Sequence, residues 1–360
     1  MDEENQVRVQ VDGRDHAGWL EVEISASIER QARSFTLAIT ESWPGAAAQA
    51  GRVRPGATAR VFIGADPVVT GHVDATPISY DAGQIRVSLR GRSKTADLVD
   101  CAPVENGGQF RNRRVEQVAR ALARPYDVEV RADVATGAAI RDHQVEPGET
   151  VFESIARMLE LRGLLSTDDA EGVLVLTRAG EGRAADALEL GRNVLSASAD
   201  FDMVDRFSEY RVLGQQAGSD LDYGETISGV RAVAEDPAVP RRRVTVITAD
   251  GQVDTGTARE RARWTAAKAA GETQRARVRV QGWRQSDGRL WQVNERTRLT
   301  CPVLGLDREM LIAEVTYRLD SAGTTTRLSL APQETFEMPP AKQVASSESS
   351  SPWGLGWEEP

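Results

Sequence analysis

The chain has 360 residues, enough for a substantial core and about two or three domains, so neither disulfides nor a metal is needed to hold it together. Its net charge of -10 argues against a protein that grips nucleic acid, because phosphate binding relies on clustered Lys and Arg. The two cysteines, Cys101 and Cys301, lie far apart in sequence, so a disulfide framework is not expected and a reducing compartment is favoured.

Targeting and membrane signals are not visible in the sequence. The opening MDEENQVRVQ holds neither a basic nor an apolar segment, so no secretory signal is expected there. No stretch approaches the roughly 18 uninterrupted apolar residues of a membrane span, and we expect a soluble protein. The basic run Arg241–Arg243 follows two prolines and precedes an alternating segment, which predicts a loop-to-strand junction.

The first segment, residues 1–100, predicts a series of short strands. Apolar and polar residues alternate along it with the period of a strand that has one wet face. The apolar positions are Val7, Val9 and Val11; Leu20, Val22 and Ile24; Phe35, Leu37 and Ile39; and Ile85, Val87 and Leu89. Turn sequences such as Asp12–Gly13 and Asp81–Gly83 separate these strands. About six strands in so short a segment favour a small barrel or sandwich.

Residues 101–190 predict a small inserted α/β domain. Apolar residues from Val115 to Leu122 follow helical spacing, and Pro125 ends that helix. A second helix packs on a strand predicted at Val173–Leu176.

The second of these helices has clear end signals. Thr150 and Glu153 form a capping box, and Gly163 is the expected residue after the helix end. The segment Val145–Ala156 resembles the opening of a LysM-type glycan-binding repeat, in which a glycine turn and a capped helix precede an apolar face. The pattern fits a plain helix start equally, so both interpretations stay open.

Residues 191–335 return to a strand pattern, with apolar alternation at Tyr210 and Val212 and again from Val244. The stretch between Gly214 and Pro240 predicts a long irregular loop that packs on a neighbouring subunit. A further helix is predicted to begin near Thr257 and Glu260 and to end at Gly271. An alternating strand then starts at Ala276.

The two β segments also resemble each other in spacing. The stretch from Arg60 to Leu89 recurs 241 positions later, where Gly64 and Asp66 fall on Gly305 and Asp307. In the middle of the match, the alignment of the two stretches has to shift by one residue. The period is far too long for a solenoid or propeller repeat. Duplication with an insertion and a chance likeness are both compatible with this pattern.

Residues 336–360 form a tail rich in Pro, Ser and small polar residues that is expected to be disordered in isolation. It carries Trp353 and Trp357, whose apolar surface needs cover. The two tryptophans either fold back on their own subunit or dock on a partner. Docking makes them the candidate partner-binding residues.

A search for chemistry yields no catalytic, cofactor-binding or metal-ligating residue. His16, His72 and His143 show no zinc-hydrolase spacing, and Gly91–Thr95 lacks the second glycine of a nucleophile elbow. Carboxylates gather in two places, and turns or a solvated strand face explain both at least as well as a metal does. These carboxylates are Asp168, Asp169 and Glu171, and Asp200, Asp202 and Asp205.

The stretch GRSKTADLVDC, from Gly91 to Cys101, resembles the signature of the Mu-type phage baseplate hub proteins. More distantly, the chain is similar to the hubs of other contractile tails and to the hub half of type VI secretion spike proteins. The likeness extends to the pattern of Pro55–Leu89, the helix that follows Pro147–Gly148 and the strand-rich last third, and so covers most of residues 1–335. The last 25 residues match no family pattern.

The resemblance implies a β-rich α+β fold: two similar tube-type β-barrel modules, residues 1–100 and 191–335, with a small α/β domain, residues 101–190, inserted between them. It implies a homotrimer with pseudo-sixfold symmetry that joins a hexameric tail tube, or a tube-initiator protein, to a trimeric membrane-piercing spike beside other baseplate proteins. DNA would pass through the lumen without specific binding.

The same resemblance implies no enzyme activity and no cofactor. The expected location is the virion tail baseplate, after assembly in the host cytoplasm. The alternative is a tail-associated glycan-binding or cell-wall-lytic protein that uses the LysM-like segment.

Overall fold

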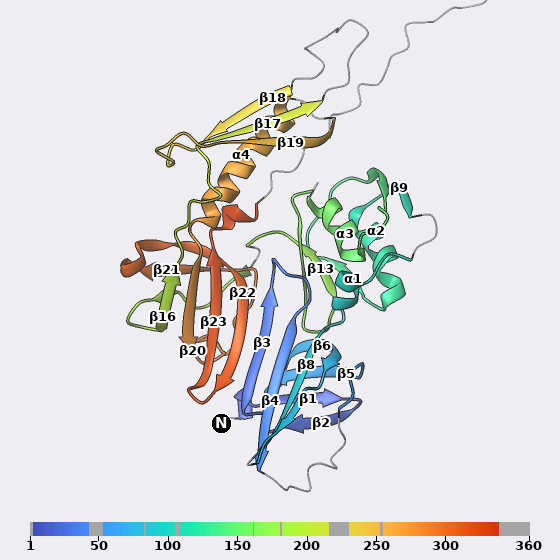
Figure 1. Cartoon of the computed structure of the whole chain (residues 1–360), viewed down its shortest axis with the longest axis vertical. Helices are drawn as coiled ribbons and strands as arrows, with labels where there is room; N and C mark the ends of the chain where they lie inside the picture. The colour runs from blue at the N-terminus through green and yellow to red at the C-terminus, as the bar shows by residue number, and fades with distance from the viewer. Residues whose placement is uncertain are drawn as a thin grey trace, which may run out of the picture.

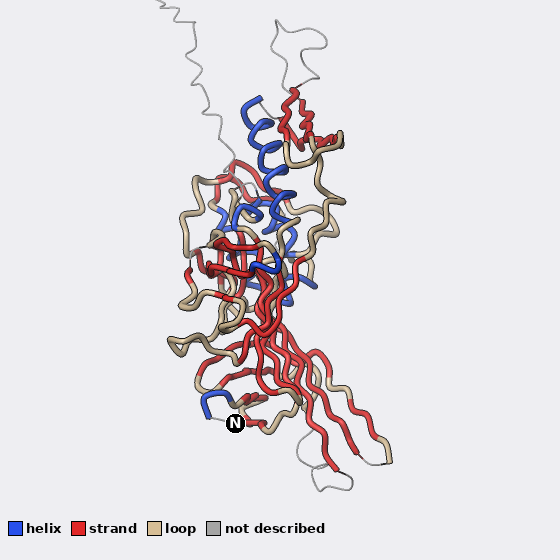
Figure 2. The backbone as a smooth tube through the Cα atoms, turned by 90° about the vertical axis from the view of Figure 1, so that its left-hand side faces the viewer, coloured by secondary structure: helices blue, strands red, loops and turns tan. Residues whose placement is uncertain are grey.

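The computed structural model describes residues 3–42, 53–82, 84–104, 108–160, 162–180, 182–215, 230–252 and 255–337. One large 15-stranded sheet runs through the molecule, and two smaller units with the longer helices lie beside it (Figure 1). Seen from the side, the strands of the large sheet run down together while most of the helices gather in the upper half (Figure 2). No helix in these ranges is both long and apolar enough to cross a bilayer.

The first β region follows a short helical turn, η1 (Glu3–Asn5), and its strands pair in the order β3-β4-β8-β6-β5-β1-β2, antiparallel at every step. The predicted alternation is confirmed: Val7, Val9 and Val11 of β1 are buried while the residues between them are not. The strands are β1 (Val7–Val11), β2 (Arg14–Ala17), β3 (Glu21–Ser27), β4 (Ser34–Ser42), β5 (Thr58–Ile63), β6 (Asp66–Ala75), β7 (Ile78–Tyr80) and β8 (Gln84–Ser93).

The α/β unit between residues 96 and 177 has its own apolar core, to which α2 and α3 each contribute one face. The capping box of α3 is confirmed, because Thr150 N donates to Glu153 Oε2 at 2.8 Å and Glu153 N donates to Thr150 Oγ1 at 3.2 Å. The elements are α1 (Ala96–Asp100), β9 (Gln109–Arg113), α2 (Val115–Ala123), η3 (Arg124–Tyr126), β10 (Val130–Ala132), β11 (Ile140–Gln144), α3 (Val151–Glu160), β12 (Leu165–Asp168) and β13 (Leu174–Thr177).

The second β region has the strand order β16-β20-β23-β22-β21, again antiparallel at every step. The short strands β14 and β15 pair with β21, so residues 182–189 lie with this region, and the limit expected near residue 190 falls closer to 180. The elements are β14 (Gly182–Arg183), β15 (Leu188–Glu189), β16 (Val194–Ala199), β20 (Ala276–Gln281), β21 (Glu295–Cys301), η4 (Pro302–Leu304), β22 (Leu306–Asp320), β23 (Gly323–Ala331) and η5 (Gln333–Thr335).

Among the residues that the structure describes, one strand pair joins the two β regions. The second half of β22 runs antiparallel to β3, with Glu314 opposite Ser27 and Leu319 opposite Val22. Side chains of both regions therefore share one apolar core, which includes Val9 and Leu37 from the first region and Val278 and Leu328 from the second.

The unit around α4 is inserted between β16 and β20, and two predictions for it were wrong. The stretch expected to be an irregular loop contains a strand, β18, that pairs with β17, while residues 216–229 lie outside the described ranges. Gly271 lies inside α4, which ends at Glu272, and its lack of a side chain lets the helix approach Thr335, since a Cβ there would lie 2.1 Å from Thr335 Oγ1. The elements are β17 (Glu209–Gln215), β18 (Val230–Glu235), β19 (Val244–Gln252) and α4 (Thr255–Glu272).

The glycine turns noted in the repeat occupy similar places. Gly64 separates β5 from β6 with φ of 60°, and Gly305 precedes β22 with φ of 66°. Both need the left-handed conformation that glycine adopts at low cost.

Candidate interaction surfaces and the domain junction

The motif Gly91–Cys101 forms the junction between the first β region and the α/β unit. It spans the end of β8, a turn and α1, and its Ser93 and Thr95 side chains are buried. Ser93 Oγ lies 2.9 Å from Thr95 Oγ1, which donates to Asp168 Oδ2 at 3.3 Å. Asp168 ends β12, so the motif reaches directly into the α/β unit.

Arg33 completes this buried network from the segment between β3 and β4. Its backbone N–H donates to Asp168 Oδ2 at 3.0 Å, and its guanidinium donates to the Asp168 carbonyl oxygen at 2.9 Å and to that of Val68 at 3.2 Å. The Asp168 side chain is 1% exposed, so its charge depends on these partners. The arrangement fixes how the α/β unit sits on the sheet.

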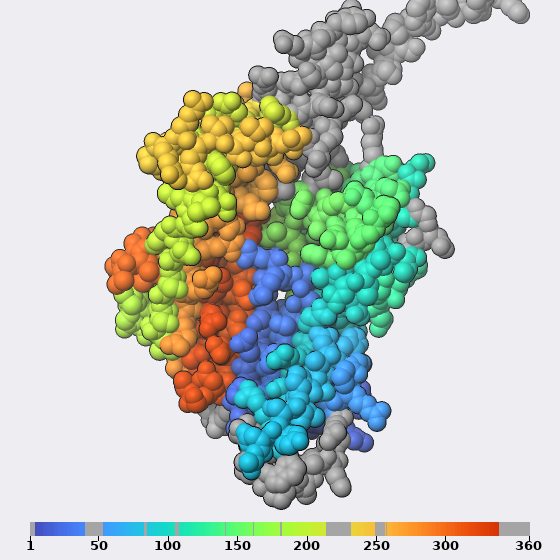
Figure 3. Space-filling model, in the orientation of Figure 1, coloured from blue at the N-terminus to red at the C-terminus, as the bar shows by residue number. Residues whose placement is uncertain are grey.

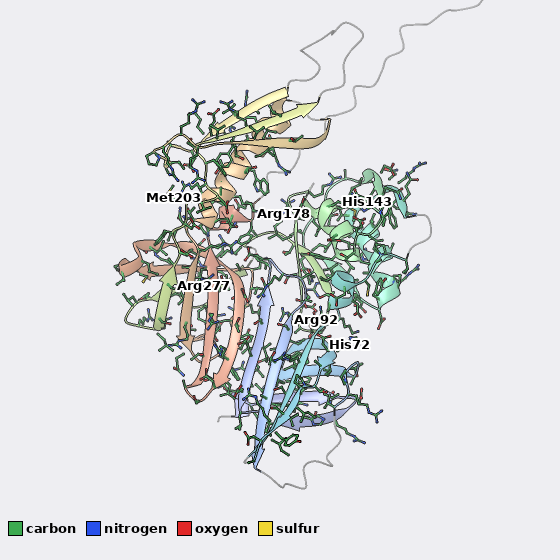
Figure 4. The ribbon with its side chains drawn as sticks, in the orientation of Figure 1. His72, Arg92, His143, Arg178, Met203 and Arg277 are labelled. Carbon is green, nitrogen blue, oxygen red and sulfur yellow. The ribbon has the colours of Figure 1, made fainter. Side chains whose placement is uncertain are left out.

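Arg92 ties the same junction together on its accessible side (Figure 4). It donates to Asp74 Oδ2 at 2.8 Å and to both carboxylate oxygens of Asp100, at 3.1 and 2.7 Å. The hydrogen bonds that Arg92 donates to Asp100 and Asp74 raise the pKa of Arg92, and those that it donates to Asp100 lower the pKa of that carboxyl. A bidentate pair of this kind adds geometric specificity to charge.

Two glycines allow the strands at the junction to approach closely. A Cβ on Gly71 would lie 1.9 Å from the Arg92 carbonyl oxygen, and a Cβ on Gly91 would lie 2.2 Å from that of His72. Gly91 also lies under the ring of Phe35. The residues that resembled part of a nucleophile elbow therefore serve packing, and the motif builds a structural junction.

One close pair escaped the sequence search. His143 Nε2 and Ser154 Oγ lie 2.8 Å apart, in the α/β unit where Figure 4 labels His143. Burial lowers the pKa of His143, and the nearby Arg157 lowers it further. Ser154 is 0% exposed, so a substrate reaches this hydroxyl only if α3 unpacks. No spacing rule links a strand histidine to a helix serine, so the sequence held no signal for the contact.

The LysM-like segment uses its apolar face inside its own unit. Val151, Ile155 and Met158 of α3 are each 0% exposed and belong to the core of the α/β unit. This stripe is therefore not available to a glycan in the folded protein.

The candidate carboxylates do not converge on a metal. Asp168 belongs to the junction, and Asp202 accepts a hydrogen bond at 2.7 Å from the backbone N–H of Val204. Within the described ranges no group of three His, Cys, Asp or Glu side chains is placed to hold a metal ion. Trp353 and Trp357 lie outside those ranges.

Several large apolar side chains remain exposed in three places: the edge strand β7, the segment around and after β16, and the face of β17–β19 that points away from α4. Scattered apolar residues need no explanation, but groups of them mark interaction surfaces. In the space-filling view the second β region and the α4 unit (yellow to red) lie on the left, and the α/β unit (green) lies on the right (Figure 3). The groups are Ile78 and Tyr80; Leu190, Leu195, Phe201, Met203 and Val204; and Leu213, Val233 and Val246.

Comparison with protein-family models matches three separate parts of the chain. Residues 6–93 match the N-terminal domain of proteins like the Mu phage baseplate assembly protein GpP. Residues 95–178 match the second domain of proteins like the baseplate hub protein gp44. Residues 254–339 match the fourth domain of the Mu phage baseplate assembly protein GpP.

Whole-chain comparisons agree with these matches. The baseplate hub protein gp44 of Escherichia phage Mu is 36% identical over 345 residues, 93% of this chain and 90% of that protein. The 43 kDa tail protein of prophage MuSo2 from Shewanella oneidensis is 31% identical with a TM-score of 0.85, over 93% of this chain and 100% of that one. An E. coli protein described as a type VI secretion component, c3393, shares the fold at 12% identity, with a TM-score of 0.56 over 92% and 80% of the two chains.

The β-rich scaffold, the structural junction built by the motif and these matches define a structural component of a phage tail baseplate. The chain belongs to the family of the Mu baseplate hub protein gp44.

Proposed function

We propose that this chain is a non-enzymatic hub that forms a homotrimeric ring with pseudo-sixfold symmetry. The ring joins the sixfold tail tube to a threefold spike, and DNA passes through its lumen. Three subunits with two similar modules each offer six similar surfaces to one partner and three unique ones to another. Assembly in the host cytoplasm and incorporation into the virion tail follow from this role.

One observation carries the proposal: the two β regions have the same strand order. β3-β4-β8-β6-β5 in the first region and β16-β20-β23-β22-β21 in the second follow the same sequence order and are antiparallel at each step. We infer that these are two copies of one tube-type barrel module, within residues 1–100 and 191–335. The α/β unit and the α4 unit are insertions in different places.

Irregularities in the two regions support this equivalence. The pairing of β6 with β8 shifts register between Val73 and Ala75, and the pairing of β22 with β23 shifts between Ile312 and Glu314. Aligning the shifts places Val73 on Ile312 and Gly91 on Leu330. The offset between the two regions is then two residues smaller than the offset between Gly64 and Gly305. A difference of two residues keeps each side chain on the same face of the sheet.

Native mass spectrometry of the purified chain, alone and mixed with the tail tube protein of the same virus, tests the proposal. We expect three copies alone and six tube-protein copies per three hub copies in the mixture. A chain that stays monomeric at high concentration contradicts the ring. Three tube-protein copies per trimer would contradict the sixfold mimicry.

The tail forms a separate proposal, that Trp353 and Trp357 dock on a partner in the baseplate. The experiment compares the full chain with a chain lacking residues 340–360 for retention of the tube and spike proteins. Reduced binding of one partner is expected, and undiminished binding of both would contradict docking.

A further inference from the structure

A cavity of about 340 Å³ lies where the α/β unit, α4 and the end of the second β region meet. α3 contributes Phe152 and Leu159 to its wall, α4 contributes Trp264, η5 contributes Thr335, and Phe336 follows η5. A volume of this size accepts a small ligand or a few side chains of a peptide. The wall is mainly apolar and comes from three parts of the molecule.

Three buried polar atoms on residues of this wall have no hydrogen-bond partner within the described ranges. They are Gln31 Nε2, Trp264 Nε1 and Thr335 Oγ1. Gln31 Oε1 accepts a hydrogen bond from Ser166 Oγ at 3.1 Å, which leaves Gln31 Nε2 as the unused donor. Buried donors without partners are costly, so a group of them in one place indicates an occupant that supplies acceptors.

The cavity follows one face of α4. Trp264, Lys268 and Gly271 are four and three residues apart, a spacing that places them on the same side of the helix. A Cβ on Gly271 would lie 2.1 Å from Thr335 Oγ1, so α4 and η5 touch at that point. Trp264 lies about 10 Å further toward the start of the helix. A chain that runs from η5 along this face therefore reaches Trp264 within about three to five residues.

The chain leaves the described ranges beside this cavity. Phe336 lies on the cavity wall, and the guanidinium of Arg275 lies 5.8 Å from the centroid of its ring. Gln333 Nε2 donates to Glu337 Oε1 at 2.6 Å, which holds the last described residue in place. A chain that continues extended from Phe336 directs the Met338 side chain to the same side, toward the cavity.

We propose that Met338–Pro340 bind in the cavity of their own chain in the polyproline II conformation. Their carbonyl oxygens accept hydrogen bonds from Trp264 Nε1 and Gln31 Nε2, and their apolar side chains pack on the aromatic rings of the wall. The bound segment ties α3 to α4 and fixes where the tail begins. This site goes beyond the proposed ring and does not depend on it.

The sequence of the segment suits the cavity. Pro339 and Pro340 have no backbone N–H, so the segment presents more acceptors than donors to a wall with unused indole and amide donors. A residue that precedes proline is biased toward extended conformations, which applies to both Met338 and Pro339. Proline-rich segments in the polyproline II conformation dock on aromatic grooves at a low entropic cost.

The charges at the edge of the cavity also agree with this occupant. Three carboxylates line it, those of Glu29, Glu160 and Glu272. Arg275 pairs with Glu29 and Glu272, so Glu160 is the carboxylate available to a further cation. Lys342 follows the proposed segment closely and is the only basic residue among residues 338–360. The segment therefore carries its cation toward the acidic edge.

Tryptic cleavage of the full chain tests the proposal, because Lys342 is the only trypsin site in residues 338–360. A protease grips the residues before the cleaved bond, so cleavage requires the segment to leave the cavity, and its rate follows the population of the open form. Trp264→Phe keeps a ring but removes the N–H. It is expected to raise the initial rate of release of residues 343–360 about fivefold, as measured by mass spectrometry.

Trp19→Phe is the matched control for this assay. Trp19 Nε1 is also buried without a partner within the described ranges, but Trp19 does not line the cavity. Its substitution should leave the rate unchanged. Equal rates in the wild type and in Trp264→Phe would overturn the proposal. Protection that disappears on dilution would also overturn it, because the occupant would then come from a second copy.

A second measurement changes the segment instead of the cavity. Fluorine NMR is recorded on the full chain labelled with fluorotryptophan, with the Trp264 resonance assigned from Trp264→Phe. Met338→Ser, Pro339→Ser and Pro340→Ser together are expected to shift that resonance, whereas Pro352→Ser in the same tail should not. An unchanged resonance in the triple variant would contradict the site. A monomeric chain that shows the shift would overturn the ring and leave the site standing.

Discussion

The two inserted units are attached to the large sheet in different ways. The chain passes from the sheet into the α/β unit at the end of β8, and this unit has a full apolar core with two amphipathic helices. The α4 unit lies between β16 and β20, which are hydrogen-bonded neighbours, and its small core is built largely from alanines. The first therefore needs a dedicated docking network, whereas the second is held at both ends by the sheet itself.

Each unit nevertheless has a buried Arg–Asp pair near the place where it joins the large sheet. The Arg33–Asp168 pair has side-chain exposures of 19% and 1%, and the Arg206–Asp236 pair 12% and 9%. Arg33 reaches from the sheet to the unit, whereas Arg206 and Asp236 both lie in the segment between β16 and β20. The first pair therefore fixes the orientation of the α/β unit on the sheet, and the second fixes the shape of the α4 unit.

Gly71→Val is expected to have the largest effect, a loss of about 4 kcal/mol or more in the free energy of unfolding. The added Cβ would meet the backbone of β8, which cannot move without breaking the sheet beside the junction. Urea unfolding measures the loss. Thr70→Val is the matched control and should be neutral, since the Thr70 hydroxyl is buried without a partner. A stable Gly71→Val protein would contradict the close approach.

Asp168→Ala is expected to cost about 3 kcal/mol, because the charge of Arg33 loses its buried partner. Limited proteolysis should show the α/β unit released from the sheet while its own core persists. Asp133→Asn removes an exposed partner of Arg131 and should change stability by less than about 1 kcal/mol. Equal effects of the two substitutions would show that the junction does not depend on Arg33.

Asp236 should make the α4 unit sensitive to acid. Hydrogen bonds from Arg206 hold the pKa of Asp236 below its ordinary value of 3.8. A depressed carboxyl pKa contributes stability above the unfolded value, and that contribution is lost as the pH falls through the folded one. Urea unfolding at pH 7 and pH 3 should therefore show a stability loss that Asp236→Asn lessens. Asp205→Asn, at an exposed position, should keep the full pH dependence.

Glu23→Gln is expected to have the smallest effect, below about 1 kcal/mol, because the Arg318–Glu23 pair across the β3–β22 joint is exposed. Thermal unfolding with and without added salt measures it. A larger loss would mean that the charges, rather than the core residues Ile24 and Tyr317, hold the two regions together.

Strands with strict alternation of large apolar residues could be predicted from the sequence. β1 and β20 are examples, because Val at every second position gives a clear period of two. β18 was missed because its buried positions are Ala232 and Ala234, which pack on Ala258 and Ala262 of α4 and give little hydropathy contrast.

The junction could be predicted only as a motif. The motif sequence identifies the stretch from Gly91 to Cys101. Its partners Arg33 and Asp168 come from distant segments and carry no local signal in the sequence. The pairing of β3 with β22 is equally long-range. Alternation predicts which face of each strand is buried, and tertiary packing decides which strands meet.

The central claim is that each subunit holds two equivalent modules. Electron cryomicroscopy of the purified ring, at a resolution that traces strands, tests it most directly. The claim predicts that residues 58–93 and 295–331 alternate at six similar positions around the axis and superpose strand for strand. A ring in which the two segments occupy unrelated positions would contradict it.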